Sequence, residues 1–161
     1  MLGKQIASMT TLQEGDKAPD FKVKNEIGEE MRLADFTGKK LVLYFYPKDS
    51  TPGCTVESCN LRDCYTQLQA EGFEVLGVSA DGEASHQKFI GKHNLPFHLL
   101  ADTEKKVLNA YGVWGPKKFM GRTYDGIHRT TFVIDEKGII EKVFIKVKTK
   151  THTEQILESY Q

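Results

Sequence analysis

A continuous apolar run at residues 41–46 (LVLYFY) constrains the fold of this 161-residue chain more than any other feature. Apolar and polar side chains do not alternate along it, so a strand here must be covered on both faces. A second run at residues 73–79 (FEVLGVS) has the same character. We therefore expect both runs to lie at the centre of a parallel or mixed β-sheet between layers of other structure.

The segments around these runs alternate between strand and helix, which predicts the α/β class. A thioredoxin-like fold, with a mixed central sheet flanked by helices, fits this order. A doubly wound nucleotide-binding fold is the alternative, but the chain has no glycine-rich phosphate fingerprint after its first strand and no phosphate-cradling lysine motif. We expect further strands at 21–24, 31–33, 97–100, 130–134 and 139–145, an extra strand pair within 113–124, and helices at 54–72, 83–93, 103–111 and 153–160.

The chain shows no internal repeat and no linker, so its length predicts one domain. We expect that domain at residues 15–161, preceded by an N-terminal extension at 1–14. The 22 acidic and 22 basic residues balance, which gives no electrostatic case for a nucleic-acid or anionic membrane partner. No apolar run approaches the length of a membrane span, and residues 1–8 lack the apolar core of a signal peptide.

All three cysteines lie in one short segment. They are too few and too clustered for a disulfide scaffold, and an odd number leaves at least one unpaired. A reducing, cytoplasmic setting is the simpler expectation. Cys54 follows Thr51, Pro52 and Gly53, at the expected first turn of a helix. Unpaired backbone N–H groups and the positive end of the helix dipole favour a thiolate there, which predicts a reactive cysteine.

Helix geometry separates the three thiols. At 100° per residue, Cys59 lies opposite the core face of the helix. Its neighbours Glu57, Ser58 and Asn60 are polar, which argues against deep burial of Cys59, and its role stays open on this ground. Five residues along a helix separate two Cα atoms by ~8.6 Å, whereas a disulfide tolerates roughly 7 Å. A Cys54–Cys59 bond therefore requires the helix to unwind. The core stripe comprises Leu61, Cys64, Tyr65 and Leu68, with Cys54 and Glu57 on the same side, so Cys64 is expected to be a packing residue.

Other chemistries fit the sequence less well. The C-x4-C-x4-C spacing is not a common zinc pattern, and the histidines are scattered, so no metal is expected. A cysteine hydrolase would need a histidine beside Cys54, for which His128 is the best candidate. A thioredoxin-type disulfide oxidoreductase would need C-x2-C, which is absent. A redox-sensing or chaperone-like interaction protein is the alternative of a different class, although no long apolar stretch supports it. The five histidines are His86, His93, His98, His128 and His152.

Residues 47–54 read P-x3-T-x2-C, which resembles the active-site motif of the peroxiredoxins. Two longer segments resemble the bacterioferritin comigratory protein group, also called peroxiredoxin Q. They are YFYPKDSTPGCTVESCNLRD and, downstream, VWGPKKFMGRTYDGIHRTTFVID. The resemblance runs from about residue 15 to the C-terminus. It implies a thioredoxin-like fold, reduction of hydrogen peroxide and organic hydroperoxides, and recycling by thioredoxin, without metal, haem or flavin.

The resemblance also implies roles for single residues. Cys54 matches the peroxidatic cysteine, and Pro47 and Thr51 match the other members of the motif. Arg129, just before an expected strand, matches the active-site arginine. The resemblance suggests that its guanidinium holds the thiolate and donates to the peroxide, and that the Thr51 hydroxyl accepts from the peroxide or donates to it or to the sulfur.

Two more positions belong to this resemblance. Cys59 matches the resolving cysteine of many members, which would condense with the Cys54 sulfenic acid to form a disulfide. Glu57 occupies the C-x2-E position of the superfamily, and we expect it to bridge to Arg129 and orient it. Cys64 matches no functional position. A monomer is expected, with a weak dimer as the alternative.

Overall fold

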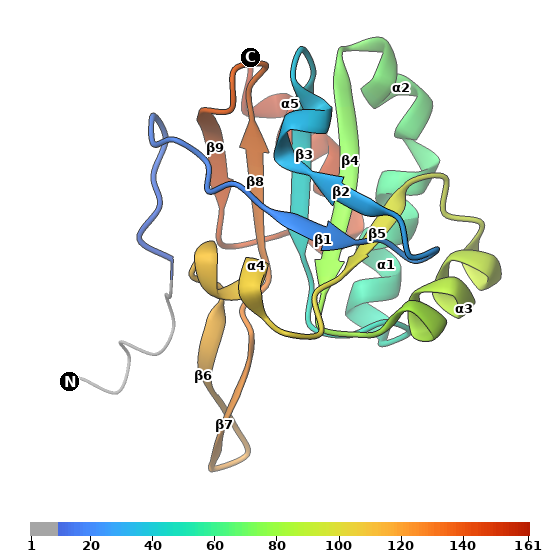
Figure 1. The fold of residues 1–161 in the computed structure, drawn as a ribbon, viewed down its shortest axis with the longest axis vertical. Coiled ribbons are helices and arrows are strands. Elements are labelled where there is room, and N and C mark those ends of the chain that lie inside the picture. The colour runs from blue at the N-terminus through green and yellow to red at the C-terminus, as the bar shows by residue number, and fades with distance from the viewer. Residues whose placement is uncertain (1–9) are drawn as a thin grey trace.

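A five-stranded mixed sheet forms the centre of the computed structural model, which describes residues 10–161 (Figure 1). The strand order is β5-β4-β3-β8-β9. Strands β3, β4 and β5 run parallel to one another, whereas β8 is antiparallel to both β3 and β9. The mixed central sheet predicted from the two apolar runs is therefore confirmed. Its strands are β3 (Lys40–Phe45), β4 (Phe73–Ser79), β5 (His98–Ala101), β8 (Thr130–Ile134) and β9 (Ile140–Phe144).

Strand β3 is buried on both faces, as its unbroken apolar sequence predicts. Leu43 and Phe45 point into one hydrophobic cluster, whereas Val42 and Tyr44 point into another on the opposite side of the sheet. All four side chains are fully buried. Because side chains alternate along a strand, β3 contributes to a hydrophobic cluster on each face of the sheet.

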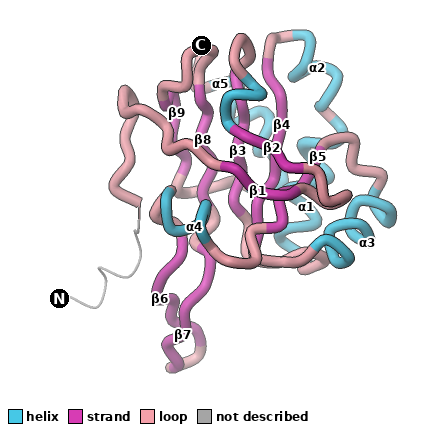
Figure 2. Tube along the Cα trace, viewed as in Figure 1, coloured by secondary structure: helices cyan, strands magenta, loops and turns pink. Residues whose placement is uncertain are grey.

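Different elements cover the two faces (Figures 1 and 2). Leu108 of the short helix α4 packs in the first cluster, on the side where the hairpin of β1 and β2 also lies. Four helices contribute to the second cluster, through Leu61, Leu68, Phe89 and Ile156. These elements are β1 (Lys22–Lys24), β2 (Glu30–Arg32), α1 (Pro52–Asp63), α2 (Tyr65–Ala70), α3 (Glu83–His93), α4 (Lys106–Ala110) and α5 (His152–Glu158), with 3-10 turns at η2 (Leu33–Phe36) and η3 (Thr149–Thr151).

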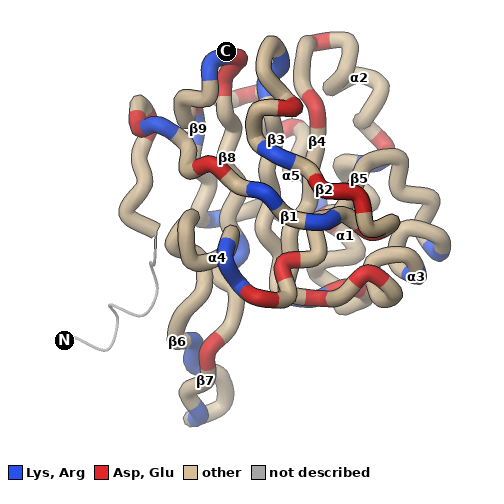
Figure 3. Tube along the Cα trace, viewed as in Figure 1, with Lys and Arg blue, Asp and Glu red and all other residues tan. Residues whose placement is uncertain are grey.

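An antiparallel arm of two strands projects from one end of the sheet (Figure 1). It consists of β6 (Trp114–Phe119) and β7 (Arg122–Ile127). The extra strand pair expected within 113–124 is thus present, and it extends to Ile127. Both basic and acidic residues occur on this arm, and they are interspersed along the rest of the described chain as well (Figure 3).

The helix expected as one element over 54–72 is divided at Cys64, whose φ of −107° and ψ of 10° leave the helical region. The core stripe is kept on both sides of the break, since Leu61 and Leu68 are both fully buried, but Cys64 is itself the residue at which the helical dihedrals are lost. The prediction that Cys64 belongs to the core is therefore wrong, since Cys64 is half-buried.

Part of the expected N-terminal extension lies outside the described residues, namely 1–9. Within 10–14, the Thr10 hydroxyl donates to the Tyr111 carbonyl at 2.8 Å, and Leu12 packs against the first cluster. The boundary at residue 15 stays a prediction. Within residues 10–161, no helix combines the length and apolarity that crossing a membrane demands.

Candidate active site

Helix α1 begins at the loop that follows β3. Thr51 is its N-cap, with extended dihedrals, and Pro52 occupies the first helical position, where its fixed φ suits the helix and its missing N–H costs nothing. The first helical bond runs from Thr55 N–H to Thr51 O at 2.8 Å. The N–H groups of Gly53 and Cys54 precede that bond, so the helix offers them no partner. The thiol therefore sits beside free backbone donors, as the sequence predicts.

The topology of the sheet brings Arg129 to Cys54. Phe45, at the end of β3, pairs with Thr130, at the start of antiparallel β8. The residue before β8 and the loop after β3 therefore meet at the same end of these two strands. There Arg129 Nη2 donates to Cys54 Sγ at 3.4 Å, and the cysteine is only 1% exposed. A buried sulfur with a guanidinium as its partner is set up to carry negative charge.

Glu57 holds the other side of the same guanidinium. Arg129 Nη1 donates to Glu57 Oε1 at 2.6 Å, so the contact predicted from the sequence is present. Glu57 lies one turn after Cys54 and its side chain is fully buried. Burial raises the pKa of Glu57 to about 7, against the lowering effect of Arg129. Burial alone would lower the pKa of Arg129, but the charges of Glu57 and Cys54 outweigh it and raise that pKa, so the guanidinium stays charged.

Gly53 leaves room for the guanidinium, which the sequence analysis did not foresee. A Cβ atom at position 53 would lie 3.2 Å from Arg129 Nη2. That distance is tighter than an ordinary carbon contact, so a side chain there would displace the group that contacts the sulfur. The only sequence signal was a glycine directly before the reactive cysteine.

The two other motif residues take different places. The Thr51 hydroxyl donates to the Lys48 carbonyl at 2.7 Å. Its proton is thereby occupied, whereas its lone pairs are available to accept from a bound hydroperoxide. Pro47 is half-buried and follows the last residues of the central strand, where its lack of an N–H ends the pairing.

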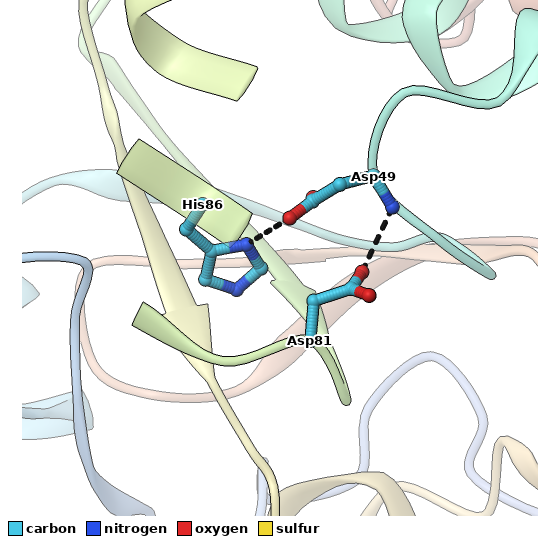
Figure 4. A group of neighbouring side chains, drawn as sticks. All are labelled: Asp49, Asp81 and His86. Atoms are coloured by element: carbon cyan, nitrogen blue, oxygen red, sulfur yellow. Dashed lines mark hydrogen bonds and ion pairs between the residues drawn. The ribbon is translucent and has the colours of Figure 1, made fainter. Parts of the chain in front are cut away.

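A buried carboxylate anchors the loop that precedes Cys54, and the sequence analysis missed it. Asp49 accepts hydrogen bonds from the Tyr46 hydroxyl at 2.5 Å, the Ser85 hydroxyl at 2.8 Å and His86 Nδ1 at 2.7 Å. Its own N–H donates to Asp81 Oδ2 at 2.8 Å (Figure 4). Burial lowers the pKa of His86, but the contact with Asp49 outweighs this effect and raises it. These bonds fasten the active-site loop to Tyr46, which directly follows β3, and to α3.

The same side chains are the group whose chemistry comes nearest to a metal site among residues 10–161. One ligand atom each from Asp49, Asp81 and His86 lies within 4.8 Å of the others. However, His86 Nδ1 is bonded to Asp49, and His86 Nε2 is bonded to the Leu100 carbonyl at 2.8 Å. Asp81 accepts from the Ser79 hydroxyl as well. The protein thus uses these atoms to hold its own loop.

All three thiols are free, and Cys54 and Cys59 lie on the same intact helix. Cys59 is half-buried, as expected. The reasoning from its polar neighbours was wrong in part, because Glu57 and Ser58 are fully buried. Each has a buried polar partner, namely Arg129 for Glu57 and the Tyr44 hydroxyl for Ser58. The hydrolase candidate His128 is engaged elsewhere, since its Nε2 donates to the Pro116 carbonyl at 2.9 Å.

Comparison with known proteins adds the family to this geometry. Residues 14–143 match the model of the AhpC/TSA family. The chain is 48% identical over 150 residues to a putative peroxiredoxin bcp of Haemophilus influenzae, covering 93% of this chain and 97% of the relative. It is 47% identical over 149 residues to peroxiredoxin Bcp of Bacillus subtilis, covering 92% and 95%.

Solved structures agree. A bacterioferritin comigratory protein of Xanthomonas campestris, described for its alkyl peroxide reduction activity, superposes with a TM-score of 0.84 at 31% identity, over 91% of this chain and 96% of the other. A cysteine-to-serine mutant of PrxQ from Xylella fastidiosa gives a TM-score of 0.87 at 30% identity, over 94% and 96%. The thioredoxin-like α/β fold predicted from the sequence is thereby confirmed.

Proposed function

This chain belongs to the AhpC/TSA family and is a thiol peroxidase of the Bcp, or peroxiredoxin Q, group, and we propose that Cys54 is the sulfur that attacks the peroxide. One observation carries the assignment: Arg129 bonds Cys54 Sγ and the buried Glu57 at the same time. A fixed cation beside a nearly inaccessible sulfur at a helix start is suited to a thiolate. Neither Cys59 nor Cys64 has such a partner among the contacts of residues 10–161.

The first chemical step follows from these groups. The Cys54 thiolate attacks one peroxide oxygen in line with the O–O bond, so an S–O bond forms while the O–O bond breaks. Sulfur is oxidised to sulfenic acid, and the leaving hydroxide or alkoxide takes a proton to become water or an alcohol. Arg129 and the free N–H groups of Gly53 and Cys54 stabilise the charge that moves onto oxygen, each by a few kcal/mol at most. Thr51 accepts from the peroxide proton and orients it.

The resolving step in this proposal belongs to Cys59. Its thiol attacks the sulfenic sulfur, a disulfide forms and water is lost. Within an intact helix the two Cα atoms are ~8.6 Å apart, beyond the roughly 7 Å that a disulfide spans. Helix α1 must therefore unwind in each cycle. Unwinding also exposes the product, because a dithiol reductant cannot reach a sulfur that is 1% exposed.

The substrates in this proposal are hydrogen peroxide and organic hydroperoxides, and the reductant is thioredoxin or a similar dithiol. Three clustered cysteines, too few for a disulfide scaffold, suit a reducing, cytoplasmic setting. A monomer suffices for the cycle, because the proposed attacking and resolving thiols lie on one helix.

Peroxide consumption with thioredoxin and its reductase tests this proposal. The Cys54→Ser variant should be inactive, and full activity there would refute the assignment. The Cys59→Ser variant should complete a first turnover, giving one sulfenic acid per chain, and then stall without thioredoxin-driven recycling. The Cys54→Ser protein should match the parent in thermal stability to within a few degrees, which separates lost chemistry from lost folding.

A further inference from the structure

One carboxylate oxygen beside the active site has no hydrogen-bond partner. Glu57 Oε2 is buried and unpaired, although Oε1 of the same group binds Arg129. A buried polar atom without a partner is costly, so an unpaired oxygen in a native site needs a physical explanation. The polar atom it faces is His152 Nε2 on α5, at 3.8 Å. His152 is fully buried as well.

The surroundings of His152 fix which ring nitrogen carries the proton. Gln155 Nε2 donates to the Lys146 carbonyl at 2.9 Å, and the Lys148 N–H donates to Gln155 Oε1 at 3.0 Å. Gln155 therefore presents its oxygen to His152 Nδ1, 2.9 Å away, and Nδ1 must be the donor. In a neutral ring, Nε2 is then an acceptor. It lies 2.8 Å from the Thr131 hydroxyl, which can donate to it.

Two acceptors thus face each other, and only a proton on one of them makes the contact favourable. At 3.8 Å the two atoms are too far apart for a hydrogen bond, and the Nε2 lone pair already accepts from Thr131, so a proton on Glu57 Oε2 removes the repulsion between the two acceptors without bonding them. On His152 the proton would point from Nε2 to the carboxylate, with Thr131 turning to accept. Burial raises the pKa of Glu57 to about 7. Burial also lowers the pKa of His152 to about 4, and the charge of Arg129 adds to that lowering. Both directions favour the proton on Glu57.

Few other groups that titrate or carry charge act on this pair. The Arg129 guanidinium faces Glu57 from the segment before β8, and the Cys54 sulfur lies on the far side of that guanidinium. The Tyr44 phenol of β3 bonds Ser58, next to Glu57, and burial together with neighbouring acidic groups keeps its pKa raised. Tyr44 therefore stays neutral near pH 7, which leaves Arg129 and Cys54 as the charges that sense the state of Glu57.

We propose that His152 is a positioning residue of this peroxidase: its Nε2, which has no proton to donate, faces Glu57 Oε2 and favours the protonated form of that carboxyl group, which leaves the charge of Arg129 free to serve Cys54. With Glu57 neutral, the positive charge of Arg129 has the sulfur as its anionic partner. When Glu57 loses the proton, its carboxylate competes for the same guanidinium. The inference deepens the proposed function, because it rests on the role assigned there to Arg129.

The protonation of Glu57 can be measured without activity. Carbon-13 NMR of the glutamate carboxyl groups, with Glu57→Gln to identify the signal, should show Glu57 titrating near neutral pH. In His152→Gln the amide can donate to Oε2 without titrating, so the midpoint should fall by about one unit. In Thr131→Val the competing hydroxyl is gone, so Nε2 is free for the Glu57 proton and the midpoint should rise. Opposite shifts in two core variants are not what general destabilisation produces.

A kinetic arm tests the link to Arg129. At pH 7 the first-turnover rate of His152→Gln should fall several-fold, because its Glu57 is ionised. His98→Gln removes another histidine–glutamate pair, with Glu26, and should change neither the Glu57 titration nor the rate. An unshifted Glu57 midpoint in both His152→Gln and Thr131→Val would overturn the effect of His152 on the protonation of Glu57. A shifted midpoint with an unchanged rate would overturn the positioning role. Full activity of Cys54→Ser would instead overturn the proposed function and leave the titration result standing.

Discussion

Asn60 fastens the middle of α1 to α5, and its removal should make resolution faster. Asn60 Nδ2 donates to the Lys150 carbonyl at 2.9 Å, and its Oδ1 accepts from the Thr153 N–H at 2.8 Å. The second bond caps the start of α5 with a side chain from α1. Asn60 lies directly after Cys59, so the proposed unwinding of α1 must break both bonds. These bonds of Asn60 therefore oppose the unwinding of α1 that the resolving step requires.

The size of the effect follows from those two bonds, because the third contact of Asn60, from Nδ2 to Glu154 Oε1, is exposed and long at 3.4 Å. Each net hydrogen bond contributes about 0.5–1.5 kcal/mol, so Asn60→Ala should lower the free energy of local opening by about 1–3 kcal/mol. If opening equilibrates before the disulfide forms, the rate of resolution rises by the same factor as the opening constant, about 5- to 150-fold. The sulfenic acid partitions between resolution and a second peroxide. The peroxide concentration that half-converts Cys54 to sulfinic acid should therefore rise by a similar factor.

Two measurements check this prediction: single-turnover disulfide formation between Cys54 and Cys59, and mass spectrometry of sulfinic acid against peroxide concentration. The matched control is Asn109→Ala, which removes a side-chain bond to the Lys105 carbonyl on the distant helix α4. The control should lose some thermal stability and keep the parent's tolerance of peroxide. An Asn60→Ala protein with normal hydrogen exchange in the sheet, yet with unchanged or lower peroxide tolerance, would refute the reasoning.

Three further substitutions test the site around the sulfur. Arg129→Lys keeps the charge but loses the planar guanidinium that reaches Cys54 and Glu57 together. Peroxide reduction followed by stopped flow should therefore slow by about 10- to 100-fold. Unchanged kinetics would show that Arg129 takes no part in the reaction. Gly53→Ala places a Cβ 3.2 Å from Arg129 Nη2 and should slow the same step without lowering thermal stability. A normal rate would show that the guanidinium can move aside and still contact the sulfur. Cys64→Ser should keep steady turnover with thioredoxin, and a collapse of recycling would mean that Cys64, not Cys59, resolves.

The sequence predicted those features that depend on local pattern. Apolar runs without alternation identified β3 and β4 as central strands, because burial on both faces demands apolar side chains throughout. Thr51, Pro52 and Gly53 marked the start of α1, because proline geometry acts within one turn, although the Thr51 side chain makes no capping bond to the helix. The contact of Arg129 with Glu57 was expected only through a family resemblance, since neither residue is near the other in the chain.

What the sequence could not supply was the pairing of buried polar groups across the fold. Asp49 and His86 are 37 positions apart, and each alone reads as a surface residue. The same holds for His152 and Glu57, whose meeting depends on how α5 docks against α1. Cys64 was misplaced for a related reason. Cys64 is the residue at which α1 ends, and nothing in the sequence around it is a glycine or proline that would mark the break.

The position of that break matters for the cycle. An attacking thiol needs a rigid helix start, whereas a resolving thiol five residues later needs the same helix to open. The structure divides these demands along the chain: Asp49 holds the loop before Cys54 through Tyr46, which follows β3, and through two side chains of α3, none of which belongs to α1. The break at Cys64 ends α1 after 12 residues. A helix of that length is marginal without tertiary contacts, so its opening need not carry α2 or the sheet with it. The contacts of Glu57 and Asn60 then help to set how often α1 opens, together with the buried side chains of Ser58 and Leu61 on the same helix.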